Sequence, residues 1–290
     1  MKKNPTFQVN TESELLPFLL DCLSNKSRNY VKGLLKRGQI TVNGKACTDY
    51  ACALSPGQQI EILLQVAPAR DKLALPVIYE DNDLIVIDKP AGMLSVSTDK
   101  ESGDTAYHLV SRYVKARNKS GQVFIVHRLD RDTSGVLLLA KSESIKRSLQ
   151  ENWNDNVLQR RYMAVVEGVV ATPEQRIVSW LKQTKTLLVY SSHNKGDGKM
   201  AITNLKALQI TAQYSLLELA LETGRKNQIR VHMKDIGHPI AGDKKYGART
   251  DPFGRLGLHA SVLIIRHPST GAQMRFESPP PGAFFKGFNQ

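Results

Sequence analysis

Residues 127–135, HRLDRDTSG, combine two carboxylates, two guanidinium groups, an imidazole and two hydroxyls directly before the apolar run VLLLA. One acid beside one arginine is usually a structural ion pair, but acids alternating with arginines at the entrance to a strand are rarer. Buried charge is costly unless it is paired, and enzymes accept that cost where a reaction needs a carboxylate of shifted pKa. The stretch therefore predicts a catalytic or substrate-binding loop, held rigidly at the end of a strand.

Several reactions fit these residue types, and the spacing argues against most of them. Ser134 lacks the flanking glycine of the G-x-S-x-G turn of hydrolases, and TGRK at 223–226 is not a Walker loop. Acids and histidines suited to metals are present, but no two of them have a strong ligand spacing such as H-E-x-x-H. This set comprises Asp130, Asp132, His232, His238, Asp243 and His259. What remains is a carboxylate that acts without a metal, as nucleophile or base, with the arginines suited to a polyanion.

A second block of chemical interest is LETGRKNQIRVH at 221–232. A strand that ends in Thr-Gly-Arg leads into a predicted helix over 226–235, which carries Gln228, Arg230 and His232. Arginine suits bidentate pairing with a carboxylate or a phosphate. The alternative is a basic start to a helix whose side chains contact only solvent.

The residues around these blocks predict short strands joined by turns, with few helices. Two β-branched runs around EDND predict a hairpin over 77–88. Ser142 is a candidate N-cap for a helix that carries Ile145, Leu149 and Trp153 on one face. Further strands are expected at 136–140, 162–166, 187–190, 202–211 and 214–221. The pattern predicts an α+β fold with a mainly antiparallel mixed sheet flanked by helices and loops, not a doubly wound parallel sheet.

A separate small α/β domain is expected at 12–68, before a polar linker at 69–76 and a second domain at 77–290. The small domain contains an amphipathic helix over 28–38, followed by short strands at 39–42 and 59–64 around the hairpin turn Asn43-Gly44.

Six basic residues and no acid lie from position 26 to position 45, among them Lys32, Lys36 and Arg37 of the predicted helix. A charge run is usually a solvated face, but basic residues clustered on neighbouring elements favour a nucleic-acid-binding surface.

The whole chain is basic, since 40 Lys and Arg against 27 Asp and Glu among 290 residues give a net charge of +13. This charge favours a polyanionic partner, because each neutralised phosphate releases a counterion, but it leaves an anionic membrane surface or simple solubility open. No segment reaches the roughly 20 apolar residues that span a bilayer, and the N-terminus lacks the apolar stretch of a signal peptide. Cys22, Cys47 and Cys52 have neither metal-ligand spacing nor an even count, so we expect reduced thiols in the cytoplasm.

Four blocks in this order resemble the RluA-type pseudouridine synthases over residues 77–285. They are IYEDNDL with KPAG (78–92), HRLDRDTSG (127–135), RYMAVVEG (161–168), and TGRKNQIRVH with GHPIAGD and Tyr246 (223–246). The small N-terminal domain resembles the RNA-binding domain named after ribosomal protein S-four. The resemblance implies the pseudouridine synthase fold and the isomerisation of uridine to pseudouridine in RNA, without metal or organic cofactor.

The resemblance also implies roles for single residues. Asp130 matches the essential aspartate, which acts at the ribose either by covalent addition or by removing a neighbouring proton to give a glycal. Arg128 matches the arginine that replaces the flipped-out nucleotide, and Tyr162 the tyrosine that stacks on uracil and is a candidate for deprotonating carbon 5. Arg230 matches the arginine that pairs with the aspartate and would lower its pKa. Further RNA contacts are expected from His127, Thr133, Arg225, Gln228, Lys32, Lys36 and Arg37.

One residue departs from the pattern of the resembled family. Asn227 stands where histidine is common, and it offers hydrogen bonds but no titratable group. Since Asp130 and Arg230 are in place, we expect activity with altered local positioning.

These observations predict a monomeric pseudouridine synthase acting on RNA, with ribosomal RNA of the large subunit as the expected substrate. One alternative is a non-catalytic RNA-binding factor for ribosome assembly, which would need only the basic surfaces. Another is a metal-dependent nuclease that uses the aspartates and histidines, whose activity would be abolished by a strong chelator.

Overall fold

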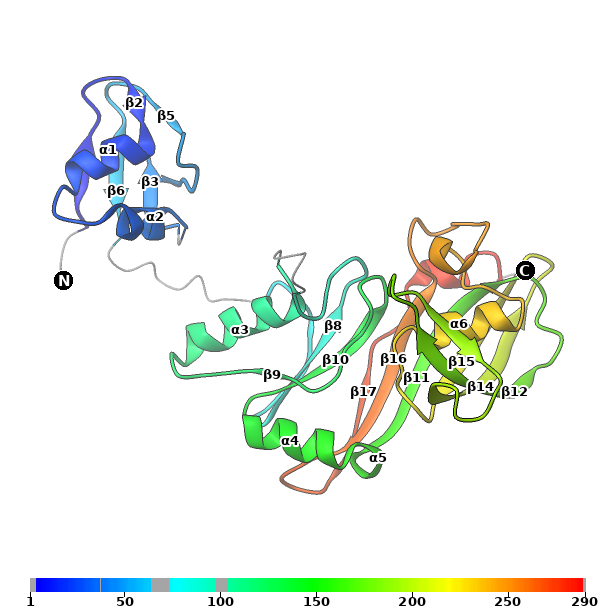
Figure 1. Ribbon diagram of the computed structural model, residues 1–290. Helices are drawn as coiled ribbons and strands as arrows, with labels where there is room; N and C mark the ends of the chain where they lie inside the picture. Colours follow the sequence, from blue (N-terminus) through cyan, green and yellow to red (C-terminus); the bar gives the residue numbers. More distant parts are fainter. Residues whose placement is uncertain (1–3, 37, 64–72, 98–103, 289–290) are drawn as a thin grey trace. The chain divides into compact units, whose positions relative to one another are not determined.

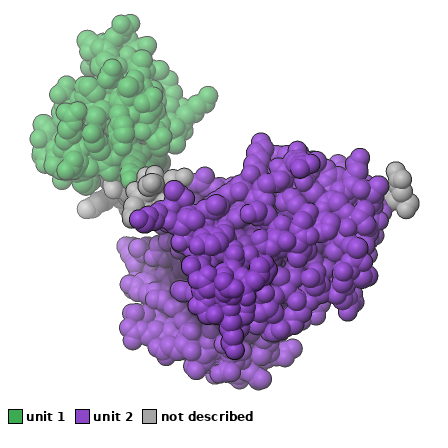
Figure 2. Space-filling view, turned by 45° about the vertical axis from the view of Figure 1, so that its right-hand side comes forward, with its two compact units in different colours: residues 1–72 green, residues 73–290 purple. Residues whose placement is uncertain are grey.

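The computed structural model describes residues 4–36, 38–63, 73–97 and 104–288. The chain divides into two units, Met1–Lys72 and Leu73–Gln290, coloured separately in Figure 2. Much of the predicted linker at 69–76 lies outside the described residues, as does Arg37. In the described parts of the chain, no helix is long and apolar enough to cross a membrane.

Unit 1 packs two helices against small antiparallel sheets with the strand orders β1-β6-β3-β4 and β2-β5. Val31, Leu34 and Leu35 are buried on one face of α2, while Lys32 on the other face is exposed, as the sequence predicts. The turn after β3 has Asn43 and Gly44 at φ values of 49° and 78°, which suits an Asn-Gly hairpin. The elements are β1 (Thr6–Gln8), β2 (Ser13–Glu14), α1 (Leu15–Cys22), α2 (Arg28–Lys36), β3 (Ile40–Val42), β4 (Lys45–Ala46), β5 (Ala53–Leu54) and β6 (Gln59–Ile62).

Unit 2 is built on an 11-stranded mixed sheet with the order β13-β12-β14-β15-β11-β16-β10-β8-β7, to which β17 and β9 add at the side (Figure 1). Among the described strands only β10 and β16 pair in parallel, so the predicted α+β fold with a mainly antiparallel sheet is confirmed. Its elements are β7 (Val77–Glu80), β8 (Leu84–Lys89), α3 (Ala106–Arg117), β9 (Phe124–Ile125), β10 (Ser134–Ala140), α4 (Glu143–Glu151), α5 (Trp153–Asn156), β11 (Val157–Glu167), β12 (Glu174–Gln183), β13 (Val189–Ser192), β14 (Lys199–Ile210), β15 (Tyr214–Leu221), α6 (Gln228–Asp235), η1 (Lys244–Tyr246), β16 (Leu258–Arg266), β17 (Gln273–Glu277) and η2 (Gly282–Phe285).

Strand β10 is buried along its whole length, and it is apolar from Val136 to Ala140 because both of its faces are covered. Leu137 and Leu139 pack on the side of α3, whereas Leu138 packs with Leu149 of α4 on the opposite side. Gly135 has a φ of 111°, and a Cβ there would overlap the carbonyl of Ala260 in β16. The close approach of β10 and β16 fixes the point at which the charged loop enters the sheet.

Most predicted elements form, with shifted ends. Ser142 caps α4 by accepting a hydrogen bond from the Ile145 N–H at 3.2 Å, as expected. Trp153, predicted on the same helix, instead begins α5, because Asn152 leaves helical geometry at φ −109° and ψ 42°. The strand predicted at 187–190 is Val189–Ser192, since Leu187 has a φ of 63° and belongs to the preceding turn.

Candidate active site

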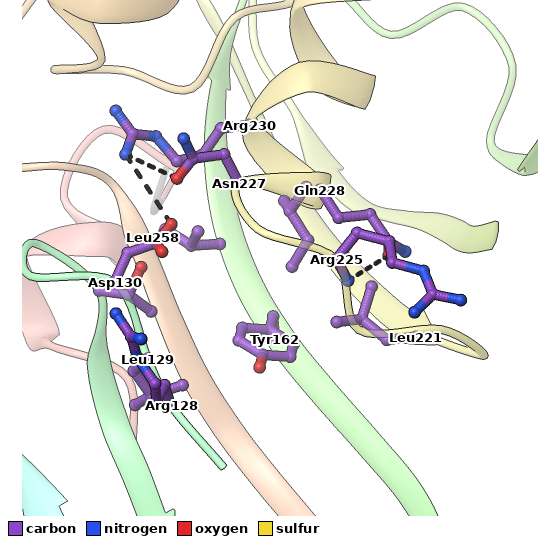
Figure 3. Close-up of a pocket in the computed structure, with 12 residues that line it drawn as sticks. Arg128, Leu129, Asp130, Tyr162, Leu221, Arg225, Asn227, Gln228, Arg230 and Leu258 are labelled. Carbon is purple, nitrogen blue, oxygen red and sulfur yellow. Dashed lines mark hydrogen bonds and ion pairs between the residues drawn. The ribbon is translucent and has the colours of Figure 1, made fainter. Parts of the chain in front are cut away.

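The charged loop before β10 faces the start of α6 across a pocket of about 70 Å³ (Figure 3). Asp130 and Arg128 come from the loop, Arg230 from α6, and Tyr162 from β11 between them. Residues spaced a hundred positions apart in the sequence therefore meet in one site, as the roles implied by the resemblance require.

The loop is held by bonds to its backbone, which leaves the side chain of Asp130 exposed to the pocket. Ser95 Oγ accepts a hydrogen bond from the Leu129 N–H at 3.1 Å and donates to the Leu129 carbonyl at 2.8 Å. Lys89 is completely buried, and its Nζ donates to the carbonyl of Arg131 at 3.0 Å. Burial lowers the pKa of Lys89 to about 8. The Thr133 N–H closes the turn on the Asp130 carbonyl at 3.2 Å.

Arg230 is oriented by a carboxylate other than the predicted one. Its Nε and Nη2 donate to the two carboxylate oxygens of Asp243, both at 2.7 Å, and the Asp243 side chain is only 1% exposed. Its Nη1 lies 3.8 Å from Oδ2 of Asp130, a long ion pair. The expected pairing of Arg230 with Asp130 is thus present, but Asp243 is the partner that fixes the guanidinium.

The pKa of Asp130 is shifted upward, opposite to the predicted direction. Burial of the carboxylate raises the pKa and outweighs Arg230, Lys226 and Arg128, which lower it, while the nearby Asp243 raises it further. The predicted lowering follows from the arginine alone, whereas desolvation disfavours the charged form and raises the pKa of a carboxyl group. A carboxylate desolvated in this way is a stronger base and nucleophile than one in water.

Tyr162 presents a neutral phenol to the same pocket. Burial and the Asp130 carboxylate raise its pKa, and only the neighbouring Arg160 lowers it. A phenol in this state can stack on a flat apolar ligand, but it is protonated at neutral pH and is not poised as a base before a substrate binds.

Comparison with known proteins gives these features an identity. A family model described as RNA pseudouridylate synthase matches residues 83–235. The uncharacterized RNA pseudouridine synthase YlyB of Bacillus subtilis is 37% identical over 273 residues, covering 91% of this chain and 89% of that protein. The chain belongs to the RNA pseudouridylate synthase family.

Further relatives and solved structures agree with this assignment. Ribosomal large subunit pseudouridine synthase D of Neisseria meningitidis serogroup A is 31% identical over 280 residues, covering 91% of this chain and 74% of that protein. The structure of human RNA pseudouridylate synthase domain containing 1 has a TM-score of 0.58 at 25% identity, covering 72% of this chain and 84% of the other. The structure of human RNA pseudouridylate synthase domain containing 4 shares the fold, with a TM-score of 0.60 at 22% identity. The match covers 74% of this chain and 92% of the other. The predicted family and its enzyme class, an isomerase of uridine in RNA, are confirmed.

Two of the residues that are expected to contact RNA, Gln228 and His127, form hydrogen bonds within the protein itself. Gln228 is buried; its Oε1 accepts from Thr223 Oγ1 at 2.8 Å, and its amide nitrogen donates to the Ile202 carbonyl at 2.9 Å. His127 Nε2 accepts the Leu138 N–H of β10 at 3.1 Å, and burial lowers the pKa of His127 to about 4. Gln228 and His127 therefore make contacts within the fold, while Gln228 also lines the pocket and His127 lines the hollow beside it.

The other predicted contacts fall into three groups. Arg128 and Arg225 are exposed and line the pocket of the synthase, while Thr133 lines it from a buried position. Lys32 and Lys36 are exposed on α2 of unit 1. Within the described ranges no cluster of three or more metal-ligating side chains is present.

Asn227, which departs from the family pattern, has a defined place in the synthase. Its φ of 54° is left-handed, a conformation that asparagine tolerates better than most residues. Its amide donates to the Tyr246 hydroxyl at 3.0 Å, and its Oδ1 accepts from Nη1 of Arg230 at 3.5 Å. Asn227 thus helps to position the guanidinium that faces Asp130.

Proposed function

We propose that this pseudouridine synthase modifies uridines in ribosomal RNA of the large subunit, with Asp130 as the catalytic residue. The name of the Neisseria relative supports the choice of RNA. The observation that carries the assignment of Asp130 is its position: it is 31% exposed, and it opens onto the pocket that contains Tyr162 and Arg230. A monomer acting in the cytoplasm, where this RNA would be met, completes the proposal.

The reaction needs no second reactant, because pseudouridine is an isomer of uridine. The target nucleotide leaves the RNA stack, and exposed Arg128 occupies the space that it vacates. The bond between ribose C1′ and uracil N1 breaks, the uracil turns while it is stacked on Tyr162, and a new bond joins C1′ to C5. The proton on C5 is lost and N1 gains one, so atoms and charge balance.

Asp130 assists the cleavage by one of two routes. Its carboxylate oxygen adds to C1′ to form a covalent ester-like intermediate that later collapses, or it removes the C2′ proton to leave a glycal, which is reprotonated afterwards. Desolvation, which raises the pKa of Asp130, favours both nucleophilic and basic behaviour. Arg230, fixed by Asp243, stabilises the carboxylate whenever it regains its negative charge.

Replacing Asp130 by asparagine tests the proposal, because it removes the nucleophile and base while preserving shape. Release of tritium from C5-labelled uridine in a large-subunit ribosomal RNA transcript should fall by roughly three or more orders of magnitude, with RNA affinity retained. Asp132→Asn is the matched control, since Asp132 lies in the same loop but is exposed and outside this pocket. Undiminished turnover in Asp130→Asn would show that another residue performs the chemistry.

The same variant separates the enzyme from a non-catalytic assembly factor. If the protein were only an RNA-binding factor, a strain with Asp130→Asn would grow normally. In that case the pseudouridines mapped in its RNA, and in the RNA of a strain without the gene, would be the same as in wild type. We expect instead that specific pseudouridines disappear in both strains.

Unit 1 is proposed as the RNA-binding domain over residues 12–68, with a linker at 69–76 and the catalytic domain at 77–290. Lys32 and Lys36 are exposed on one helix, and Nζ of Lys32 lies 5.7 Å from the ring centre of the exposed Tyr50. Cations beside exposed aromatic rings suit an RNA backbone and its unpaired bases.

A further inference from the structure

Arg160 lies on the wall of a second, larger hollow that adjoins the active-site pocket. This hollow, the side groove, has a volume of about 1110 Å³ and is lined among others by Trp153, Arg160, Met200 and Arg225. It shares Asp130 and Tyr162 with the pocket, so the two hollows adjoin at the residues that would surround the target base.

The guanidinium of Arg160 is held in one place by its surroundings. Its central carbon lies 5.6 Å from the ring centre of Trp153, and its Nη2 donates to the Leu221 carbonyl at 3.3 Å. A methyl group at Gly224 would overlap Nη1. The side chain is therefore positioned in advance, which lowers the entropy lost on binding a ligand.

Its charge, by contrast, is not neutralised by the protein. No carboxylate of the described residues forms an ion pair with Arg160, and one of the side chains that shift its pKa is another cation, Arg225. Burial lowers the pKa of Arg160, Tyr162 raises it and Arg225 lowers it, but a guanidinium stays charged at any pH that the protein meets. Arg161, the next residue of β11, pairs instead with Glu218 at 3.3 Å.

We propose that Arg160 binds a backbone phosphate of the substrate RNA next to the flipped-out uridine. A desolvated cation without a carboxylate partner, on the wall of a groove that leads to the reaction site, is satisfied best by an anion. The planar fork of arginine matches two phosphate oxygens, and the site lies beside Tyr162, against which the target base would stack. This inference rests on the proposed function, because it takes RNA as the ligand.

The rival explanation is that Arg160 only packs against Trp153 and contributes to folding. Arg160→Gln distinguishes the two, with an unmodified large-subunit ribosomal RNA transcript as the probe. We expect KM to rise about tenfold with kcat little changed, because a phosphate contact contributes to binding of substrate and transition state alike. The slope of log affinity against log salt should become shallower by about 0.7–0.9, the value for one phosphate.

Three further variants sharpen the test. Arg161→Gln removes the same charge from the adjacent residue and should leave KM and the salt slope unchanged, since a half-exposed pair with Glu218 contributes little. Arg160→Lys should restore the salt slope without restoring KM fully, because lysine keeps the charge but not the fork. Gly224→Ala should also raise KM, as Arg160→Gln does, because the added methyl group displaces Nη1 of Arg160.

Wild-type KM and salt slope in Arg160→Gln would overturn the inference, as would a lower melting temperature accompanied by an unchanged salt slope. Failure of the proposed function gives a different result, namely that the wild-type protein forms no pseudouridine in the transcript while the salt slopes of the variants still differ.

Discussion

Asp243 is the residue whose replacement tests most directly how the site controls its carboxylate. Asp243→Asn removes one charge and one of the two oxygens that bind Arg230, both at 2.7 Å. The side chains of Arg230 and Asp243 are 11% and 1% exposed, so the cost is that of breaking a buried pair, about 3 kcal/mol. For a unit of this size, that free energy corresponds to a fall in melting temperature of roughly 6–12 °C.

The same substitution should shift the pH dependence of catalysis in a defined direction. The negative charge of Asp243 raises the pKa of Asp130, and the released Arg230 is free to pair more closely with Asp130. Both changes lower the pKa of Asp130 in the variant. The acid limb of kcat/KM, which reports the free enzyme, should therefore move to lower pH, while the maximal rate falls because Asp130 becomes a weaker base.

The assay is tritium release from C5-labelled uridine across the pH range, together with thermal unfolding followed by circular dichroism. Asp251→Asn is a suitable control, since Asp251 is exposed and lies close to Gly242, in the same segment of chain. An acid limb that stays in place or moves to higher pH would refute the electrostatic reasoning. A melting temperature within about 1 °C of wild type would refute the assigned cost of the buried pair.

Two other predictions concern unit 1 and the loop. Replacing Lys32 and Lys36 together by glutamine should make the salt slope of RNA binding shallower by about 1.4–1.8 with kcat unchanged, and an unaltered slope would exclude these lysines from the interface. His127 has a pKa of about 4 when folded and about 6.5 when unfolded, so the unfolded state takes up its proton first as the pH falls and the folded state is destabilised between these values. His127→Gln keeps an acceptor for the Leu138 N–H but does not titrate, so wild type should lose roughly 1–3 kcal/mol relative to this variant between pH 7 and pH 4. Urea unfolding of both proteins at pH 7 and pH 4 measures this difference. If wild type and His127→Gln differed in free energy of unfolding by the same amount at both pH values, the lowered pKa of His127 would be contradicted.

Those parts of the fold with a strong local pattern could be predicted from the sequence. The apolar run of β10 and the Asn-Gly turn after β3 depend on short-range chemistry and form as expected. Helix α3 was missed although its signal is present: Thr105 caps it, and Leu109, Val110 and Tyr113 have helical spacing and are buried. Strands β12, β16 and β17 were not predicted, although β17 alternates between exposed polar and less exposed apolar residues and all of β16 except Arg266 is at least partly buried.

The site was predictable in its members but not in its hydrogen bonds. The motifs identify Asp130, Tyr162 and Arg230, which the fold brings together. No local pattern shows that Asp243 takes the guanidinium of Arg230, because the two meet only when the segment after α6 folds back. The direction of the pKa shift of Asp130 was missed for the same reason, since desolvation depends on what the tertiary structure packs around the carboxylate.

Residues 127–135 anchor the loop as well as supplying the reacting carboxylate. A loop that must hold one carboxylate at a fixed point cannot rely on that side chain's own bonds, because those bonds would occupy the reacting oxygens. Here the anchors are elsewhere: His127 holds β10, the Arg131 carbonyl binds buried Lys89, and Ser134 Oγ donates to His259 Nδ1 at 2.8 Å. Of the charged side chains in residues 127–135, only those of Asp130 and Arg128 line the pocket. Rigid anchoring of the neighbours is what allows Asp130 to remain both fixed and reactive.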